Sequence, residues 1–180
     1  MSDPAIDLKQ DFFTLFDLPR RFKLDDVALD QRYRDLQSQV HPDKSAHLSD
    51  AEQRLAMQSS TRVNEGYQIL RNPLRRGRYL LSLYGVDTQE ENNTAMPMDF
   101  LMQQMEMREA LQEAVDTQDL DTLDELSDTT RDETRLLQQE LAEQLDFKQA
   151  FVEAAGTVRK LRFLEKLAEE IADAYDELDP

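Results

Sequence analysis

The chain has 180 residues, of which 33% are charged and 39% hydrophobic, with four glycines and six prolines. This balance is typical of a helical protein whose helices are amphipathic rather than apolar all round. No run approaches the length of a membrane-spanning apolar segment, so none is expected. Because the sequence lacks cysteine, disulfides, thiol nucleophiles and thiolate metal sites are excluded.

Charge is distributed unevenly along the chain. Residues 1–84 hold 13 Lys and Arg against 12 Asp and Glu, a sum of +1, whereas residues 85–180 hold 8 against 26, a sum of −18. Such asymmetry predicts two units with different partners, and the acidic half is expected to repel nucleic acid and anionic membranes. The first seven residues carry acids and no apolar core, which argues against a targeting segment. A cytoplasmic location is therefore expected.

Two helices are predicted at the start of the first unit. An aromatic-rich segment over residues 11–16 is too short to be stable alone and must pack on another element. Asp25 is a candidate N-cap for a helix that begins at Asp26. Its apolar stripe recurs at helical spacing, at Leu29, Tyr33, Leu36 and Val40. Arg34 falls well away from that stripe, so we expect its side chain in water.

Two further helices follow. Ser49 and Glu52 form a capping box before a helix whose predicted apolar face carries Leu55, Val63, Tyr67 and Leu70. Ser59 and Gly66 on that face are small enough for the partner helix to approach closely. A link of about eight residues predicts that this helix packs antiparallel to the preceding one. Asn72-Pro73 then predicts another helix, which Gly85 ends after Tyr84.

The tripeptide His41-Pro42-Asp43 lies between the two longer helices of this unit. Pro42 stops the first of them and pushes His41 towards an extended conformation, so both flanking side chains are expected to point outward. A proline stop with local turn hydrogen bonds would use the same residues. A metal site made by His41 and His47 lacks a clear third ligand, and no nucleophile pattern accompanies the histidine. We interpret the tripeptide as a protein-binding element.

Over roughly residues 11–84 these features resemble the J-domain, the co-chaperone module that drives ATP hydrolysis by DnaK-type chaperones. The matching features are the aromatic first helix, a helix with basic residues before the tripeptide, Lys44 after it, and two later helices. The resemblance implies a chaperone-docking site made of the tripeptide and nearby cations: His41, Pro42, Asp43, Lys44, Arg34 and Arg32.

The second unit is predicted to be a bundle of helices. Residues 85–97 are polar and without apolar period, which is typical of a linker, and Pro97 marks the next helix start. Three helical patterns follow, over residues 98–116, about 119–145 and about 148–178. The economical architecture is a short antiparallel three-helix bundle. The sequence therefore predicts an all-α chain with units at 1–84 and 98–180.

The first helix of the bundle has two apolar arcs. The core arc holds Phe100, Met107, Leu111, Ala114 and Val115, at about 100° per residue. The second arc holds Met98, Leu101, Met102 and Met105, and it is flanked by Glu106, Glu109 and Glu113. Exposed methionine-rich patches rimmed by charge often bind a partner, but the same residues could widen the core stripe. This helix alone leaves both interpretations open.

The third helix adds a family resemblance. Its predicted core positions are Leu161, Leu164, Ala168, Ile171, Tyr175 and Leu178, with Phe163 at the stripe's edge among cations. The segment Thr157-Val158-Arg159-Lys160-Leu161-Arg162-Phe163-Leu164-Glu165-Lys166-Leu167 resembles a signature of the HscB family of specialised J-proteins. Residues 11–16, 80–85 and 100–109 match the same family, so the resemblance spans nearly the whole chain.

The HscB resemblance implies a co-chaperone that delivers an IscU-like iron–sulfur scaffold to an HscA-like DnaK-type chaperone, with no catalytic activity, cofactor or metal of its own. Its scaffold-binding surface would comprise Leu101, Met102, Met105, Phe163, Glu106, Glu109 and Glu113. Met105 stands where leucine is commoner in the family, a swap that a thioether tolerates. Two alternatives remain at this point. One is a general J-protein for unfolded clients, and the other is a purely structural helical scaffold.

Overall fold

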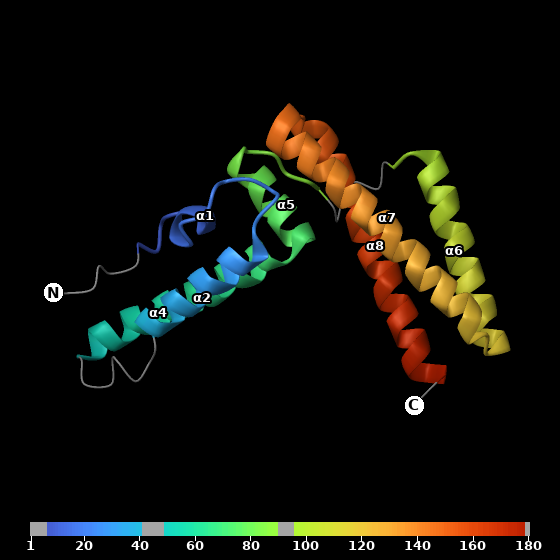
Figure 1. The fold of residues 1–180 in the computed structure, drawn as a ribbon, viewed down its shortest axis with the longest axis horizontal. Helices are drawn as coiled ribbons and strands as arrows, with labels where there is room; N and C mark the ends of the chain where they lie inside the picture. Colours follow the sequence, from blue (N-terminus) through green and yellow to red (C-terminus); the bar gives the residue numbers. More distant parts are fainter. Residues whose placement is uncertain (1–6, 41–48, 90–95, 179–180) are drawn as a thin grey trace. The chain divides into compact units, whose positions relative to one another are not determined.

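The computed structural model describes residues 7–40, 49–89 and 96–178, and within these residues every regular element is helical, as predicted (Figure 1). The chain divides into two compact units, Met1–Leu80 and Leu81–Pro180. The helices are α1 (Phe12–Leu15), α2 (Asp26–Val40), α4 (Asp50–Arg71), α5 (Pro73–Leu83), α6 (Met98–Thr117), α7 (Leu120–Glu143), the π-helix η1 (Gln144–Lys148) and α8 (Phe151–Leu178).

The predicted helix starts of the first unit are confirmed by their capping hydrogen bonds. The Asp25 carboxylate accepts from the backbone N–H of Val27 at 2.9 Å. At the start of α4 the Glu52 carboxylate accepts from the backbone N–H of Ser49 at 3.0 Å, as a capping box requires. The Asn72 side chain caps α5 by accepting from the N–H of Arg75 at 2.9 Å. These starts are local chemistry, because each cap satisfies amide donors that lack a partner in the first turn.

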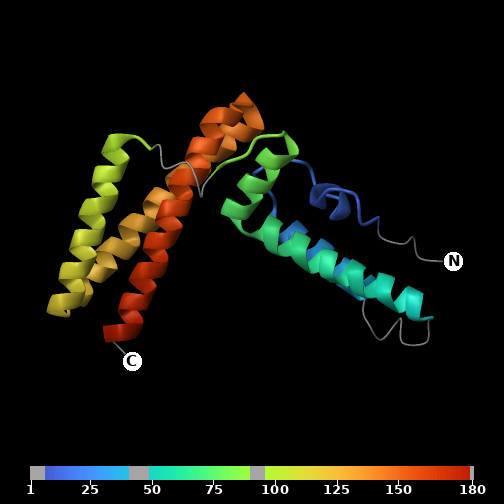
Figure 2. The same cartoon turned by 180° about the vertical axis from the view of Figure 1, so that it is seen from behind.

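Helices α2 and α4 lie side by side and run antiparallel, as both views of the ribbon show (Figures 1 and 2). The rings of Tyr33 and Tyr67 stack across them with centroids 4.0 Å apart, and the Tyr33 hydroxyl donates to Oδ1 of Asn64 at 2.9 Å. The Tyr67 hydroxyl donates to Asp30 at 2.9 Å, and this bond raises the pKa of Tyr67. The ring stack fixes the register of the two helices.

Two expectations about α4 need correction. Leu55 is 43% exposed rather than part of the helix interface. It lies three turns before Tyr67, whereas α2 ends two turns after Tyr33, so the antiparallel partner helix stops short of it. The close approach at Gly66 does occur, but it is made by Phe12 and Phe16 rather than by α2. Helix α1, which is too short to be stable alone, thus packs on α4.

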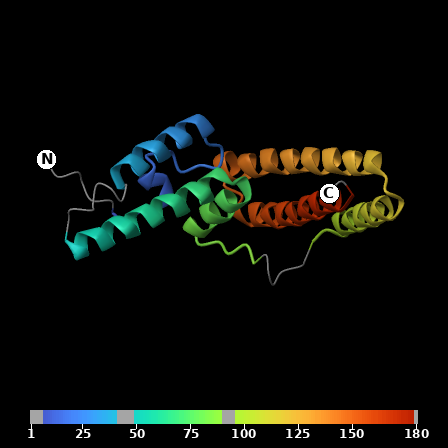
Figure 3. The same cartoon turned by 90° about the horizontal axis from the view of Figure 1, so that it is seen from below.

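The second unit is a three-helix bundle in which α6 and α8 run in one direction and α7 in the other (Figures 1 and 3). Its core cluster comprises Met107, Leu111, Ala114, Leu123, Leu126, Leu167, Ile171 and Ala174. Leu167 is fully buried where the apolar pattern predicted Ala168, which is exposed. Of the predicted core positions, Val115, Tyr175 and Leu178 pack on this cluster but are only partly buried. Leu167 rather than Ala168 occupies this core position, and the larger leucine side chain buries more apolar surface there.

The connection between α7 and α8 differs from the predicted pattern. Helix α7 ends at Glu143 and continues as η1, and α8 begins at Phe151 rather than at residue 148. Gln149 adopts a left-handed conformation, φ 52°, at the end of η1. Leu145 is buried within the π-helix. The predicted helical pattern ran to residue 145, and Leu145 is buried as that pattern requires. It lies on the π-helix η1, however, and not on a continuation of the α-helix α7.

The segment from Tyr84 to Thr88, which includes the start of the predicted linker, packs within the second unit. The ring of Tyr84 stacks on Phe151 with centroids 4.4 Å apart, and Nη1 of Arg159 donates to the carbonyl oxygen of Thr88 at 3.0 Å. Gly85 has φ +74°, which confirms its predicted role in ending α5. In the described part of the chain, no helix combines the length and apolar content needed to cross a membrane.

Candidate functional site

The predicted chaperone-docking residues fall into two groups. Arg32 and Arg34 lie on α2 and are described by the structure. His41, Pro42, Asp43 and Lys44 lie outside the described residues, as does His47. In sequence, the tripeptide directly follows Val40, the last residue of α2. The docking site as a whole therefore stays a prediction.

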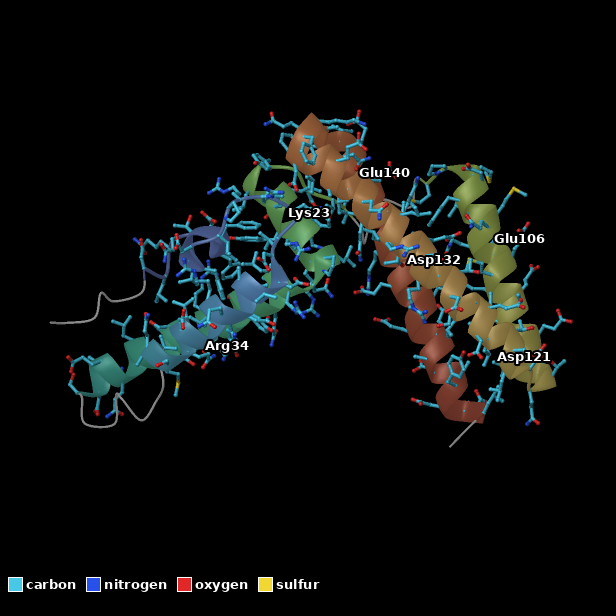
Figure 4. All side chains as sticks on the ribbon, viewed as in Figure 1. Lys23, Arg34, Glu106, Asp121, Asp132 and Glu140 are labelled. Atoms are coloured by element: carbon cyan, nitrogen blue, oxygen red, sulfur yellow. The ribbon has the colours of Figure 1, made fainter. Side chains whose placement is uncertain are left out.

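Arg34 and Arg32 are both exposed on α2, as predicted for Arg34 from the apolar stripe. Nη2 of Arg34 donates to Oε1 of Gln31, one turn earlier, at 2.9 Å. Arg32 forms a salt bridge with Asp17, and both side chains stay solvent-exposed. Figure 4 labels Arg34 on α2. Exposed cations of this kind can reorient towards an anionic partner surface, because surface ion pairs contribute little stability.

The structure answers the question that the first bundle helix left open. Met102 and Met105 on α6 are 55% and 63% exposed, whereas Met107 on the same helix is 7% exposed. Leu101 and Phe163 are partly buried. The second apolar arc is therefore not an extension of the core. We call Leu101, Met102, Met105 and Phe163 the α6–α8 face.

An acidic line borders the α6–α8 face. Glu106, Glu109 and Glu113 are all exposed on α6, and Figure 4 labels Glu106 on that helix. Residues seven apart on a helix point in nearly the same direction, so Glu106 and Glu113 line up along α6 with Glu109 beside them. An apolar surface with a carboxylate edge fits a partner that presents apolar side chains next to cations.

Phe163 is joined to α6 by an aromatic contact that the helical pattern did not anticipate. Phe100 was predicted to be a core residue, but it is only partly buried, and its ring meets Phe163 edge-on at 6.1 Å between centroids. Nζ of Lys160 lies 5.8 Å from the centroid of the Phe100 ring. Phe100 thus belongs to the border of the α6–α8 face. A periodicity count cannot separate it from the core, because both lie in one arc of α6.

Two polar contacts that sequence reasoning missed also hold α6 in the bundle. The Gln103 side chain donates to Glu133 on α7, and burial raises the pKa of Glu133 although the Gln103 hydrogen bond lowers it. On the α8 side, Nε of Arg108 lies 2.9 Å from Oε2 of Glu170. Both contacts link residues at least thirty positions apart. No local sequence pattern indicates such pairs.

Residues suited to hold a metal do not gather in the described part of the chain: no group of three or more His, Asp or Glu side chains has that arrangement there. The carboxylates of the second unit are spread over helix surfaces. The arrangement on α6 and α8 is suited to binding another protein through a mixed apolar and acidic surface.

Comparison with known proteins places these features in a family. Residues 96–172 match the family model described as the HSCB C-terminal oligomerisation domain. A co-chaperone protein HscB homolog from Chromobacterium violaceum is 56% identical over 172 residues, which is 96% of this chain and 97% of that protein.

Solved structures of the same family share the fold. Chaperone HscB from Vibrio cholerae is 35% identical, with a TM-score of 0.83 over 94% of this chain and 99% of that one. Human co-chaperone protein HscB is 32% identical, with a TM-score of 0.87 over 93% of this chain and 83% of that one. The described helices thus correspond to a J-domain followed by a C-terminal helical domain. Co-chaperones of this kind act with a chaperone and are not enzymes. The chain belongs to the HscB family of co-chaperone proteins.

Proposed function

We propose that this co-chaperone binds an IscU-like iron–sulfur scaffold protein, delivers it to an HscA-like DnaK-type chaperone and stimulates ATP hydrolysis by that chaperone. In this proposal residues 1–84 form the J-domain and residues 98–180 the scaffold-binding domain, with 85–97 between them. The protein would work in the cytoplasm and aid cluster transfer and protein maturation. Family membership supports the role of co-chaperone, and the α6–α8 face supports a folded client.

The exposure of Met102 and Met105 is the observation that carries the proposal. Two large apolar side chains left in water beside a carboxylate edge have no role in the core of the bundle. Burial of each Leu, Met or Phe contributes roughly 1.5–3 kcal/mol, before association costs of several kcal/mol. Four such residues favour an affinity on the order of micromolar. Weak binding suits a protein that must release its client.

The J-domain part of the proposal rests on the sequence. His41, Pro42 and Asp43 would dock on the ATPase domain of the chaperone, and Lys44, Arg34 and Arg32 would add electrostatic contacts. Exposed arginines on α2 support this assignment, because cations at the rim of an interface raise the rate of encounter with an acidic partner. His41→Gln should then abolish stimulation of ATP hydrolysis while leaving scaffold binding intact. Loss of both activities together would contradict the two-site assignment.

One helix offers a matched test of the scaffold surface. Met102→Ala/Met105→Ala removes exposed methionines and should weaken scaffold binding by at least tenfold, with the free energy of unfolding changed by less than about 0.5 kcal/mol. Met107→Ala removes a buried methionine from the same helix and should cost about 2–5 kcal/mol of stability. Calorimetric titration with the apo scaffold and urea denaturation measure the two effects.

The same variants distinguish a co-chaperone dedicated to the scaffold protein from a general J-protein that binds unfolded clients. Titration with a denatured model protein should show weaker binding than titration with the folded scaffold, and the methionine substitutions should hardly change it. Equal binding of both clients would favour a general J-protein instead. Unchanged scaffold binding by the Met102→Ala/Met105→Ala variant would remove the α6–α8 face from the proposed site.

A further inference from the structure

The α6–α8 face is built from two helices whose contributions lie about sixty positions apart in the sequence. The buried residues of α6 are Gln104, Met107, Leu111 and Ala114, so its first six residues add none. Leu101 and Met102 therefore lie at the end of α6 that the core anchors least. The edge-on contact between Phe100 and Phe163 joins this end of α6 to α8, and the spacing of the two helices also depends on contacts further along their seam.

Arg108 and Glu170 are placed to hold that spacing. Nε of Arg108 lies 2.9 Å from Oε2 of Glu170, and Nη2 lies 3.5 Å from Oε1, so the two side chains meet at two points. Nη1 of Arg108 also donates to the carbonyl oxygen of Gln104 at 3.4 Å, which ties the guanidinium to its own helix. A two-pronged contact fixes the orientation of both side chains as well as their distance.

The position of the pair along the helices connects it to the face. Arg108 follows Leu101 by seven residues on α6, and Glu170 follows Phe163 by seven residues on α8. Seven residues are close to two helical turns. Each partner therefore lies on the same side of its helix as a residue of the α6–α8 face, two turns closer to the C-terminal end of that helix. Because α6 and α8 run in the same direction (Figures 1 and 3), the ion pair closes the α6–α8 seam two turns beyond Leu101 and Phe163.

We propose that Arg108 and Glu170 are a positioning pair for scaffold binding: they set the spacing of α6 and α8 that brings Leu101, Met105 and Phe163 into one surface. The inference rests on the function proposed above. Both side chains are partly solvent-exposed, and such pairs contribute little to overall stability. Their effect is therefore on the geometry of the face, and neither side chain has to touch the scaffold.

Charge reversal tests this role directly. Arg108→Glu and Glu170→Arg each place like charges across the seam, and each should weaken scaffold binding about tenfold. The double variant Arg108→Glu/Glu170→Arg restores opposite charges and should bind within about threefold of the wild-type protein. Arg131→Glu is the matched control, since Arg131 pairs with Asp128 inside α7 and its reversal changes net charge by the same amount as Arg108→Glu.

The signs of the charge changes separate positioning from direct attraction. Arg108→Glu makes the protein more negative by two charges, and Glu170→Arg makes it more positive by two. Direct electrostatic contact with the scaffold would move the affinity in opposite directions for the two variants, whereas a positioning pair weakens it in both. Opposite effects, or a double variant no better than the single ones, would overturn the inference.

A distance measurement gives a readout that does not depend on binding. The chain has no cysteine, so cysteines introduced at the exposed positions Asp99 on α6 and Glu169 on α8 can be spin-labelled selectively. We expect a narrow distance distribution in the wild-type background, a broader or longer one in each single reversal, and recovery in the double variant. Unchanged distributions in the single variants would overturn the positioning role.

Failure of the proposed function would show a different pattern. In that case the wild-type protein would not bind the scaffold, or the Met102→Ala/Met105→Ala variant would bind it as the wild-type protein does, whatever the spin labels report. If those substitutions weaken binding but the charge reversals do not, the function stands and the positioning pair is wrong.

Discussion

The ring of Phe12 occupies the space where the first side-chain carbon of any residue other than glycine at position 66 would lie. A Cβ on Gly66 would stand 2.6 Å from Cδ1 of Phe12, and 2.8 Å from Cε2 of Phe16. Both rings are buried, and the backbone N–H of Phe12 donates to the Tyr79 hydroxyl at 3.0 Å. The four-residue helix α1 is therefore seated on α4 by a contact that only glycine permits.

Gly66→Ala should destabilise the protein by about 1–3 kcal/mol, because the added methyl group overpacks a buried site. Alanine favours a helix interior over glycine by about 1 kcal/mol, so the loss would occur against the helix propensity. Gly156→Ala on α8 is the control: the nearest atom to its Cβ is Nη2 of Arg159 at 3.8 Å, and this variant should be more stable than the wild-type protein. Urea denaturation measures both, and a Gly66→Ala variant as stable as the wild type would show that α1 can shift.

Gly66 also shows how far the sequence could predict the fold. The helical period and the small residue together predicted a close approach at α4, which the structure confirms. They could not say that the approaching element was α1 rather than α2, because that choice depends on how three elements share one surface. Caps such as Asp25 and Ser49 were predictable since their hydrogen bonds span only a few residues.

The candidate site was predictable to a similar extent. The two apolar arcs predicted for α6 separated Met102 and Met105 from Met107, and the exposure of these side chains confirms that separation. It could not place Phe100, which shares an arc with the core yet borders the α6–α8 face, nor the Arg108–Glu170 pair between two distant helices. Such contacts depend on the tertiary arrangement, to which a helical period is insensitive.

Arg34→Glu should weaken the functional interaction with the chaperone without affecting the fold. Arg34 is exposed and bonds only to Gln31 among the contacts described for it, so the free energy of unfolding should change by less than about 0.5 kcal/mol. The concentration of co-chaperone that gives half-maximal stimulation of ATP hydrolysis should rise about tenfold at low salt, and less at high salt. Arg135→Glu on α7 reverses another exposed charge and should leave stimulation unchanged. Equal effects of the two variants would indicate a response to net charge alone.

Gln104→Met should stabilise the second unit. Gln104 is 2% exposed, and its Oε1 has no hydrogen-bond partner within the described structure. Its amide group makes only a long contact of 3.9 Å to the sulfur of Met107. Methionine has a similar shape and removes the cost of an unsatisfied buried oxygen, so we expect a gain of about 1 kcal/mol. A lower melting temperature in calorimetry would instead mean that Gln104 makes an important polar contact, for example through a buried water molecule.

Asp11→Asn should reduce the loss of stability at acid pH. Burial acts to raise the pKa of Asp11, but hydrogen bonds from Thr14 and Arg20 outweigh it and hold the pKa below the ordinary value of 3.8. The folded state thus favours the ionised carboxylate. This contribution is fully present well above pH 4 and is lost as the pH falls through the lowered pKa.

Asparagine keeps the capping oxygen of Asp11 at the start of α1 and removes only its charge, including the salt bridge to Arg20 at 2.7 Å. At neutral pH the Asp11→Asn variant should lose less than about 1 kcal/mol, since the Arg20 side chain is 47% exposed and solvent screens the ion pair. Between pH 5 and pH 2, chemical denaturation should show a shallower fall in unfolding free energy for the variant than for the wild-type protein. Arg20→Gln removes the cationic partner and should flatten the same interval in part. An Asp11→Asn profile parallel to that of the wild type would mean that the carboxylate titrates alike in the folded and unfolded chains.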